Sequence, residues 1–238
     1  MNVLAWNYRG LGLDLTVGEL RDLVRSHNPA VVFLSETKKS ARAMEKLKWT
    51  LGFRSGVVVS SMGRSGGLVM WWREHVHATI RPWCQYFLDA EVVLDGKTFR
   101  ITGFYGELDT EKRKKSWDAL HFLRSQDNLP WLCVGDFNEA MFQSDQQGGN
   151  LRSFTQMEDF RDCLAECGLA DLGFSGYRYT WDNRRDGDAN VQVRLDRATC
   201  TDAFLEMFSE TNVENLITEE SDHLALLVHV LETAPTQR

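Results

Sequence analysis

Acidic, amide, phenol and histidine side chains recur in this chain where predicted strands begin or end. The set comprises Asn7, Glu36, Tyr105, Asp136, Asn138, Asp196, Asp222 and His223. Polar groups at strand ends commonly converge on one rim of a sheet, where ligands bind. Oxygen donors of this kind suit Mg²⁺ or Mn²⁺, and no His-rich or thiolate motif of a zinc site accompanies them. Taken together they predict a site for a hard cation, although each one alone is typical of an ordinary turn.

An alternation of short strands and helices must position these side chains. Predicted strands cover Val3–Trp6, Val31–Ser35, Gly56–Ser60, Gly67–Trp72, Val76–Ile80, Phe87–Leu94, Thr98–Tyr105, Trp131–Val134, Tyr177–Trp181, Val191–Leu195 and Leu224–Leu231. Predicted helices cover about Thr16–Ser26, Ala41–Trp49, Thr110–Arg124, Phe154–Cys167 and Asp202–Phe208. The first helix is expected to open with the capping box Thr16-x-x-Glu19. Asp95-Gly96 predicts a tight hairpin within a run of antiparallel strands.

This mixture of strands and helices predicts an α+β fold or a layered α/β sandwich. No Pro/Gly/Ser-rich linker divides the chain of 238 residues. We therefore expect one catalytic domain over residues 1–232, with a C-terminal tail at 233–238.

Charge and hydropathy narrow the class of protein. The formal net charge is −7. Residues 201–238 hold eight acids and one Arg, so the rest of the chain is balanced. The basic runs Lys112–Lys115 and Arg184-Arg185 are each either a solvated face or a phosphate contact. The longest apolar run, Ala30–Leu34, is far too short to span a membrane, and no signal peptide begins the chain. We expect a soluble protein with no membrane partner.

The five cysteines are odd in number and form no CxxC pair. Cys163 and Cys167 are spaced as neighbours on one helix face, and the simplest interpretation is reduced thiols in the core. A reducing compartment, the cytosol or the nucleus, follows from this interpretation.

Six short motifs occur in a fixed order. They are W-N-x-x-G-L at Trp6–Leu11, S-E-T at Ser35–Thr37, F-Y at Phe104–Tyr105, G-D-F-N at Gly135–Asn138, R-L-D at Arg194–Asp196 and S-D-H at Ser221–His223. In type and order they resemble the endonuclease/exonuclease/phosphatase superfamily, which includes exonuclease-III-like abasic endonucleases. The resemblance implies a four-layer α/β sandwich, with two mixed β-sheets packed face to face and helices outside.

Within that superfamily the chain looks most like the endonuclease domain of plant LINE-type (non-LTR) retrotransposons. The resemblance is carried by the opening NVLAWNYRGLG, by Gly148-Gly149, by Tyr179–Trp181 and by R-L-D-R from Arg194. It implies a Mg²⁺-dependent endonuclease, with Mn²⁺ as an acceptable substitute. Such an enzyme nicks double-stranded DNA and leaves a 3′-hydroxyl that primes reverse transcription. It also implies a reverse transcriptase domain in the same polyprotein, and action in the nucleus after synthesis in the cytoplasm.

The resemblance also implies roles for single residues. Glu36, Asn7 and Asp222 match metal-site groups, and Asp136 matches the residue that orients or deprotonates the attacking water. Asn138 and Tyr105 match a polar stabiliser and a phosphate-contacting phenol. His223 matches the group on the scissile phosphate, and Asp196 the carboxylate that keeps that imidazole cationic. We expect DNA contacts from the polar hairpin tip Asp182–Asn190, at Arg184 and Arg185, and from Arg194 and Trp181; a solvated turn is the competing interpretation of this tip.

The chain departs from the family pattern at Tyr8, at Ala225 and, most informatively, at Val193. Abasic endonucleases carry a pocket-lining Trp at the position of Val193, which disfavours an abasic-site repair endonuclease. Two further interpretations stay open: a phosphatase or phosphodiesterase that acts on a small substrate, and a catalytically decayed domain that only binds nucleic acid.

Overall fold

The computed structural model describes residues 1–9, 14–60 and 66–232. The tail predicted at 233–238 and the last two residues of the first motif, Gly10 and Leu11, lie outside the described residues.

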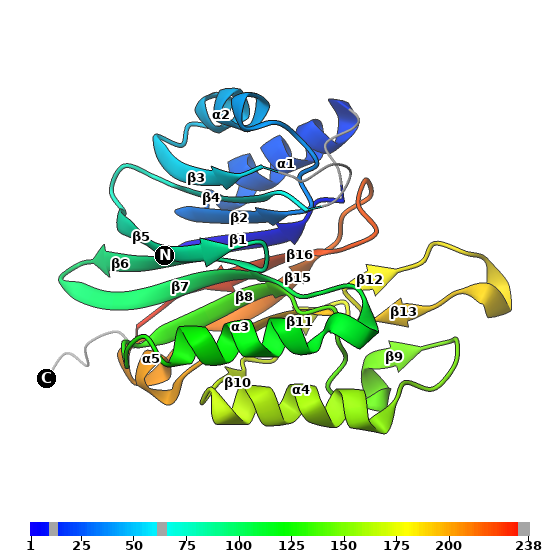
Figure 1. Ribbon diagram of the computed structural model, residues 1–238. Coiled ribbons are helices and arrows are strands. Elements are labelled where there is room, and N and C mark those ends of the chain that lie inside the picture. Colours follow the sequence, from blue (N-terminus) through cyan, green and yellow to red (C-terminus); the bar gives the residue numbers. More distant parts are fainter. Residues whose placement is uncertain (10–13, 61–65, 233–238) are drawn as a thin grey trace, which may run out of the picture.

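Two large mixed sheets form the middle of the protein (Figure 1). One has seven strands, in the order β11 (Ser175–Gly176), β15 (Asn212–Leu216), β16 (Ala225–His229), β1 (Asn2–Asn7), β2 (Val31–Ser35), β4 (Leu68–Trp72) and β3 (Ser55–Val59). The other has six, in the order β10 (Ala170–Asp171), β14 (Asp196–Cys200), β8 (Trp131–Asp136), β7 (Lys97–Tyr105), β6 (Phe87–Leu94) and β5 (His77–Cys84). Three described pairs, β1–β2, β11–β15 and β7–β8, are parallel.

Helices cover the outer faces of both sheets (Figure 1). The longer ones are α1 (Asp14–His27) and α2 (Ala41–Thr50) on the seven-stranded sheet, and α3 (Lys114–Arg124) and α4 (Phe154–Glu166) on the six-stranded sheet. The shorter ones are α5 (Asp202–Met207) and the 3₁₀ turns Thr110–Lys112, Gln143–Asp145 and Gly187–Ala189. No helix in the described part of the chain is both long and apolar enough to cross a membrane. The predicted four-layer sandwich is confirmed.

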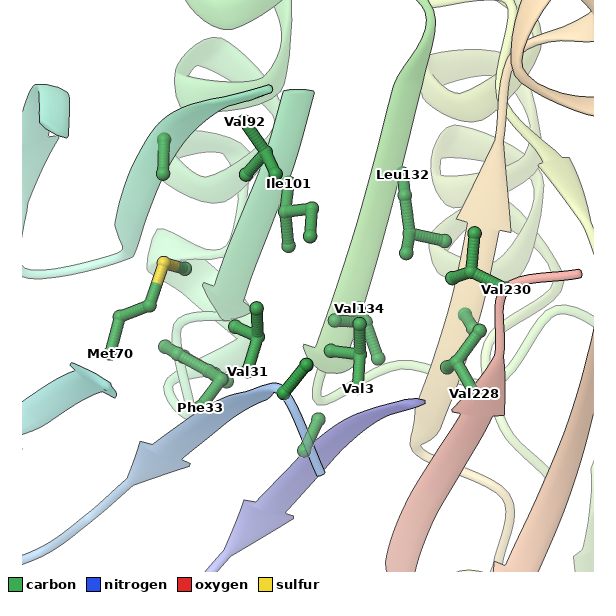
Figure 2. Packing of buried hydrophobic residues seen from close by; sticks show 14 of the residues in the cluster. Val3, Val31, Phe33, Met70, Val92, Ile101, Leu132, Val134, Val228 and Val230 are labelled. Atoms are coloured by element: carbon green, nitrogen blue, oxygen red, sulfur yellow. The ribbon is translucent and has the colours of Figure 1, made fainter. Parts of the chain in front are cut away.

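Side chains alternate between the two faces of each central strand. In β1, Val3 points toward the opposite sheet, whereas Leu4 packs beneath α1 and α2. Figure 2 shows the inner layer, where Phe33 of one sheet lies opposite Ile101 of the other. This apolar layer holds the sheets face to face, so the ends of their central strands meet at a common edge.

A small third sheet carries the polar hairpin. Its strands are β12 (Trp181–Asp182), β13 (Gln192–Val193) and β9 (Gln146–Gln147). The hairpin between β12 and β13 projects from the body of the sandwich (Figure 1). The predicted strands here were too long, because polar side chains and turns interrupt the ladder after two residues on each side.

Several predicted boundaries were wrong. Helix α1 begins at Asp14, so Thr16 lies inside its first turn and is not the N-cap. Strand β14 was missed, and Asp196 begins that strand instead of ending the one before it. Strand β15 was also missed. The tight hairpin at Asp95-Gly96 is confirmed: both residues have positive φ, +50° and +79°, and the flanking residues pair directly.

Candidate active site

The polar side chains meet where the central strands of the two sheets end. Asn7 is the last residue of β1, and Glu36 follows the last residue of the neighbouring β2. Tyr105 and Asp136 are the last residues of the parallel strands β7 and β8. Asp196, the first residue of β14, pairs with Asp136 of β8. Because β1 and β2 pack on β7 and β8, these ends form one rim.

Strand β16 brings the last motif to the same rim. It runs antiparallel to β1, with Ala225 opposite Trp6, so Asp222 and His223 enter next to Asn7. The hydroxyl of Ser221 donates to the Asn7 carbonyl at 2.8 Å, and Trp6 Nε1 donates to the His223 carbonyl at 2.9 Å. Positions more than two hundred residues apart are therefore fixed by direct hydrogen bonds.

The Asn7 side chain is the centre of the site. Its Nδ2 lies 2.8 Å from Asp136 Oδ2, 3.3 Å from Glu36 Oε1 and 3.4 Å from His223 Nε2. Its Oδ1 accepts the backbone N–H of Arg9 at 3.2 Å. In this orientation Asn7 donates to the carboxylates and fixes their spacing.

His223 and Asp196 form a buried imidazole–carboxylate pair. His223 Nδ1 lies 2.8 Å from Asp196 Oδ2, while the Thr180 hydroxyl accepts the Asp196 N–H at 2.9 Å. Burial alone lowers the pKa of His223, but the Asp196 and Asp136 carboxylates outweigh it and raise the pKa to about 9. The imidazole is therefore cationic at neutral pH.

Asp136 is almost completely buried. Its Oδ1 accepts the backbone N–H of Asn138 at 2.8 Å, and its Oδ2 lies 3.9 Å from His223 Nε2. Burial, followed by the Asp196 charge, raises the pKa of Asp136 to about 7. Asn138 has a positive φ of +57°, and its side chain donates to the Gly106 carbonyl, so it supports Asp136 through the backbone. A carboxylate with a pKa near 7 is suited to general-base chemistry.

Gly135 explains why the G-D-F-N turn needs its glycine. Its φ is +144°, and a Cβ there would lie 2.1 Å from the Phe104 carbonyl oxygen. The close approach of β7 to β8 at this point sets Tyr105 beside Asp136.

Glu36 is held in its ionised form. Burial favours the neutral acid, but hydrogen bonds from Lys38 and Tyr105 lower the pKa of Glu36 below its ordinary value. The Tyr105 hydroxyl donates to Oε1 at 2.7 Å, and Lys38 Nζ lies 2.9 Å from Oε2. Burial and the Glu36 charge raise the pKa of Tyr105, which is therefore a neutral donor.

Asp222 leaves one oxygen without a partner. Its Oδ2 accepts a hydrogen bond from Trp181 Nε1 at 2.9 Å and also forms an ion pair with Arg9. Its Oδ1 is buried and has no hydrogen-bond partner among the described residues. An unpaired buried carboxylate oxygen is costly unless a cation or water satisfies it.

These side chains fit a hard divalent cation. Glu36 and Asp222 offer oxygen ligands, and their ion pairs with Lys38 and Arg9 show that both carboxylates attract positive charge. Oxygen donors favour Mg²⁺ or Mn²⁺. Asp136, Asp196 and His223 also lie close enough to share an ion, but the short Asp196–His223 contact occupies two of their donor atoms.

The residues expected to contact DNA differ in their exposure and in their hydrogen-bond partners. Arg185 is exposed at the hairpin tip. The Arg184 guanidinium bonds the carbonyls of Glu219 and Ser221, which ties the hairpin to the loop before His223. Trp181 is half-buried against Asp222.

Arg194 is not part of the rim. Its guanidinium is buried, lies over the Phe174 ring and pairs with Asp171 at 2.8 Å. Within the basic run Lys112–Lys115, only Arg113 is buried, where it forms an ion pair with Glu139. The three lysines are exposed.

Sequence reasoning missed three residues that complete the site. Arg9 and Lys38 neutralise Asp222 and Glu36, and Thr180 positions Asp196. Lys38 directly follows the S-E-T motif and Thr180 is the centre of Y-T-W, so a signal was available for both. Arg9 lies inside W-N-x-x-G-L, so the same kind of signal was available for it.

A model of the endonuclease/exonuclease/phosphatase family matches residues 4–223. No curated protein sequence matches the chain. The fold is similar to three solved structures. The 3′-5′ exonuclease NExo from Neisseria meningitidis has a TM-score of 0.74 and 17% identity, covering 97% of this chain and all of that one. The endonuclease domain of TRAS1, a telomere-specific non-LTR retrotransposon, has a TM-score of 0.71 and 18% identity; the match covers 98% of this chain and 99% of that domain. The AP endonuclease LMAP from Leishmania major has a TM-score of 0.75 and 17% identity; the match covers 95% of this chain and 86% of that enzyme. At these identities the likeness shows the fold.

Proposed function

The chain belongs to the endonuclease/exonuclease/phosphatase family, and on this premise we propose that it is a metal-dependent DNA endonuclease of a LINE-type retrotransposon. Members of the family are hydrolytic nucleases and phosphatases. The observation that carries the proposal is the Asn7 amide, which donates to Glu36 and Asp136 and lies 3.4 Å from the ring of the cationic His223, so that all three groups surround one point of the rim. Cation ligands, a base and a cationic donor are the groups that phosphodiester hydrolysis requires.

Each side chain then has a role in cleavage. Asp136 accepts the proton of the attacking water, because its pKa of about 7 leaves it basic at neutral pH. His223, held by Asp196, donates to a non-bridging phosphate oxygen. Tyr105 orients Glu36. Glu36 and Asp222 would hold the divalent cation, which would supply charge neutralisation for the phosphate and the leaving 3′ oxygen.

The proposal includes the biological setting. The substrate is double-stranded DNA, the nick ends in a 3′-hydroxyl, and a reverse transcriptase domain of the same polyprotein extends it in the nucleus. Similarity to the TRAS1 endonuclease domain supports this setting. Residues 1–232 act as one catalytic domain, and specificity for plant elements rests on the sequence resemblance.

A comparison of substrates tests the proposal. The purified chain with Mg²⁺ is offered supercoiled plasmid, a duplex with one abasic site, and phosphorylated small molecules. We expect nicking of undamaged plasmid. Cleavage confined to the abasic duplex supports a repair endonuclease, and turnover of small molecules alone supports a phosphatase. Val193, in β13, is buried against Met157 and Leu195, and it stands where abasic endonucleases carry a pocket-lining Trp, which favours the first outcome.

The pH dependence of nicking should be bell-shaped. The rate is expected to rise through about pH 7, where Asp136 ionises, and to fall through about pH 9, where His223 loses its proton. Asp196→Asn removes a charge that raises both pKa values, so both limbs should move to lower pH by about 1–3 units. The exposed Asp118→Asn is the matched control. An alkaline limb that stays in place in Asp196→Asn contradicts the assignment.

The hairpin tip should contribute to DNA affinity through Arg185. We expect Arg185→Ala to weaken binding and to lower the slope of log affinity against log salt by about 0.9, as for one lost phosphate contact. Arg42→Ala, an exposed change on α2, is the control. Equal salt slopes for Arg185→Ala and the wild type would contradict a DNA contact and support the interpretation of the tip as a solvated turn.

A further inference from the structure

A second group of metal-ligating side chains lies between α3 and α4, outside the catalytic rim. It contains His121 in the last turn of α3, Cys163 in α4, and Cys167, which caps α4. Their donor atoms all lie within 4.8 Å of one another. The two helices run side by side over the six-stranded sheet (Figure 1). None of these residues takes part in the chemistry proposed above.

The helix spacing brings the two sulfur atoms together. Cys163 and Cys167 are four residues apart, so both face the sheet on one side of α4. Both side chains are buried, and the Cys163 thiol donates to the Trp117 carbonyl at 3.9 Å. All five cysteines of the chain are free, so this pair forms no disulfide. Two adjacent thiols in reduced form are available to a metal.

Glu166 supplies a fourth donor beside His121. The His121 Nε2 atom is buried and 2.9 Å from Glu166 Oε2, yet it has no well-aligned hydrogen bond among the described residues. A cleft of about 520 Å³ between the helices is lined by His121, Cys163 and Glu166, so an ion can reach them from solvent. The imidazole nitrogen thus lies beside Glu166 and can be approached from solvent.

The local field also favours a cation. Both helices end here, and the carboxyl end of a helix carries partial negative charge.

We propose that Cys163, Cys167, His121 and Glu166 form a structural Zn²⁺ site that joins α3 to α4. Two thiolates, an imidazole and a carboxylate are soft-to-borderline donors that select zinc over magnesium. Tetrahedral zinc, with bonds of about 2.0–2.3 Å, requires donors about 3.3–3.8 Å apart. The donor atoms of His121, Cys163 and Cys167 already lie within 4.8 Å of one another, and rotation of the partly exposed His121 and Glu166 side chains would bring the set to this spacing. Each coordinated thiol releases its proton to solvent, so binding tightens as pH rises.

Co²⁺ and Zn²⁺ binding to the full chain, kept reduced with a phosphine, tests this site. Thiolate-bound Co²⁺ gives an ultraviolet charge-transfer band that an oxygen-ligated ion does not give. The affinity for Zn²⁺ is measured by competition with a chromogenic chelator. We expect the thiolate band, and displacement of Co²⁺ by one Zn²⁺ per chain. A His223→Gln background should give the same result, because the catalytic rim is not involved.

Ligand variants identify the site. We expect Cys163→Ser, Cys167→Ser and His121→Asn each to lower zinc affinity by more than about 100-fold, since even indirect support of a metal ligand is worth about 10–100-fold. Cys84→Ser and His77→Asn, on β5, are matched controls and should bind as the wild type does. His121 is partly exposed, so its variant should fold normally and still nick plasmid in Mg²⁺. Absence of the thiolate band in the wild type, or unchanged zinc affinity in the folded His121→Asn variant, would overturn the proposal.

Discussion

Replacing Asp136 with Asn is expected to slow plasmid nicking by about 10²–10⁴-fold, the usual loss when a positioned base is removed. Asn has the shape of Asp and can still accept the Asn138 N–H, but it loses the hydrogen bond from Asn7 and cannot take a proton from water. Burial already disfavours ionised Asp136, as its raised pKa shows, and removing this charge offsets the lost hydrogen bond from Asn7, so the unfolding temperature should change little. Loss of rate without loss of stability would mark a chemical role.

The control for this experiment is Asp118→Asn, an exposed change of the same chemistry on α3. It should nick plasmid at the wild-type rate. An Asp136→Asn enzyme that stays within about tenfold of the wild type would assign the base to another residue.

Replacing His223 with Gln is expected to slow nicking by about 10²–10³-fold, as for the loss of one preorganised donor to a developing charge. Gln keeps an N–H donor but carries no charge, so the alkaline limb near pH 9 should also disappear. Exposed His77→Gln is the matched control. A His223→Gln enzyme that retains the alkaline limb would show that another group titrates there.

The same variant has a stability signature. The pKa of His223 is raised above its ordinary value, so the folded state holds the proton more tightly than the unfolded chain. This stabilisation is complete below about pH 6.5 and is lost as pH rises through about 9. Denaturant unfolding at a series of pH values should show that loss in the wild type and not in His223→Gln.

The convergence of the polar residues could be predicted because it depends on simple strand patterns. Buried β-branched runs such as Val31–Ser35 identify the central strands, and Glu36 or Asp136 then follows from its position at a strand end. The tight turn at Asp95-Gly96 was equally readable, since its two positive φ values require such residues.

Elements that depend on tertiary contacts could not be predicted from the sequence. Strand β15 carries Asn and Glu at alternate positions and forms only because β16 lies beside it. Arg194, expected at the DNA, is instead drawn to Asp171, a pairing between residues far apart in sequence. The His121 and Cys163 pairing has the same origin, because it depends on how α3 packs against α4.

The most direct test of the central claim is the chemistry of the nick itself. Supercoiled plasmid is incubated with the wild-type chain in Mg²⁺, with and without EDTA, and the nicked product is given to a DNA polymerase with labelled nucleotides. We predict nicking only in the presence of Mg²⁺, and immediate extension from a free 3′-hydroxyl. Nicking that persists in EDTA, or ends that accept label only after phosphatase treatment, would contradict a metal-dependent site that releases the 3′ oxygen.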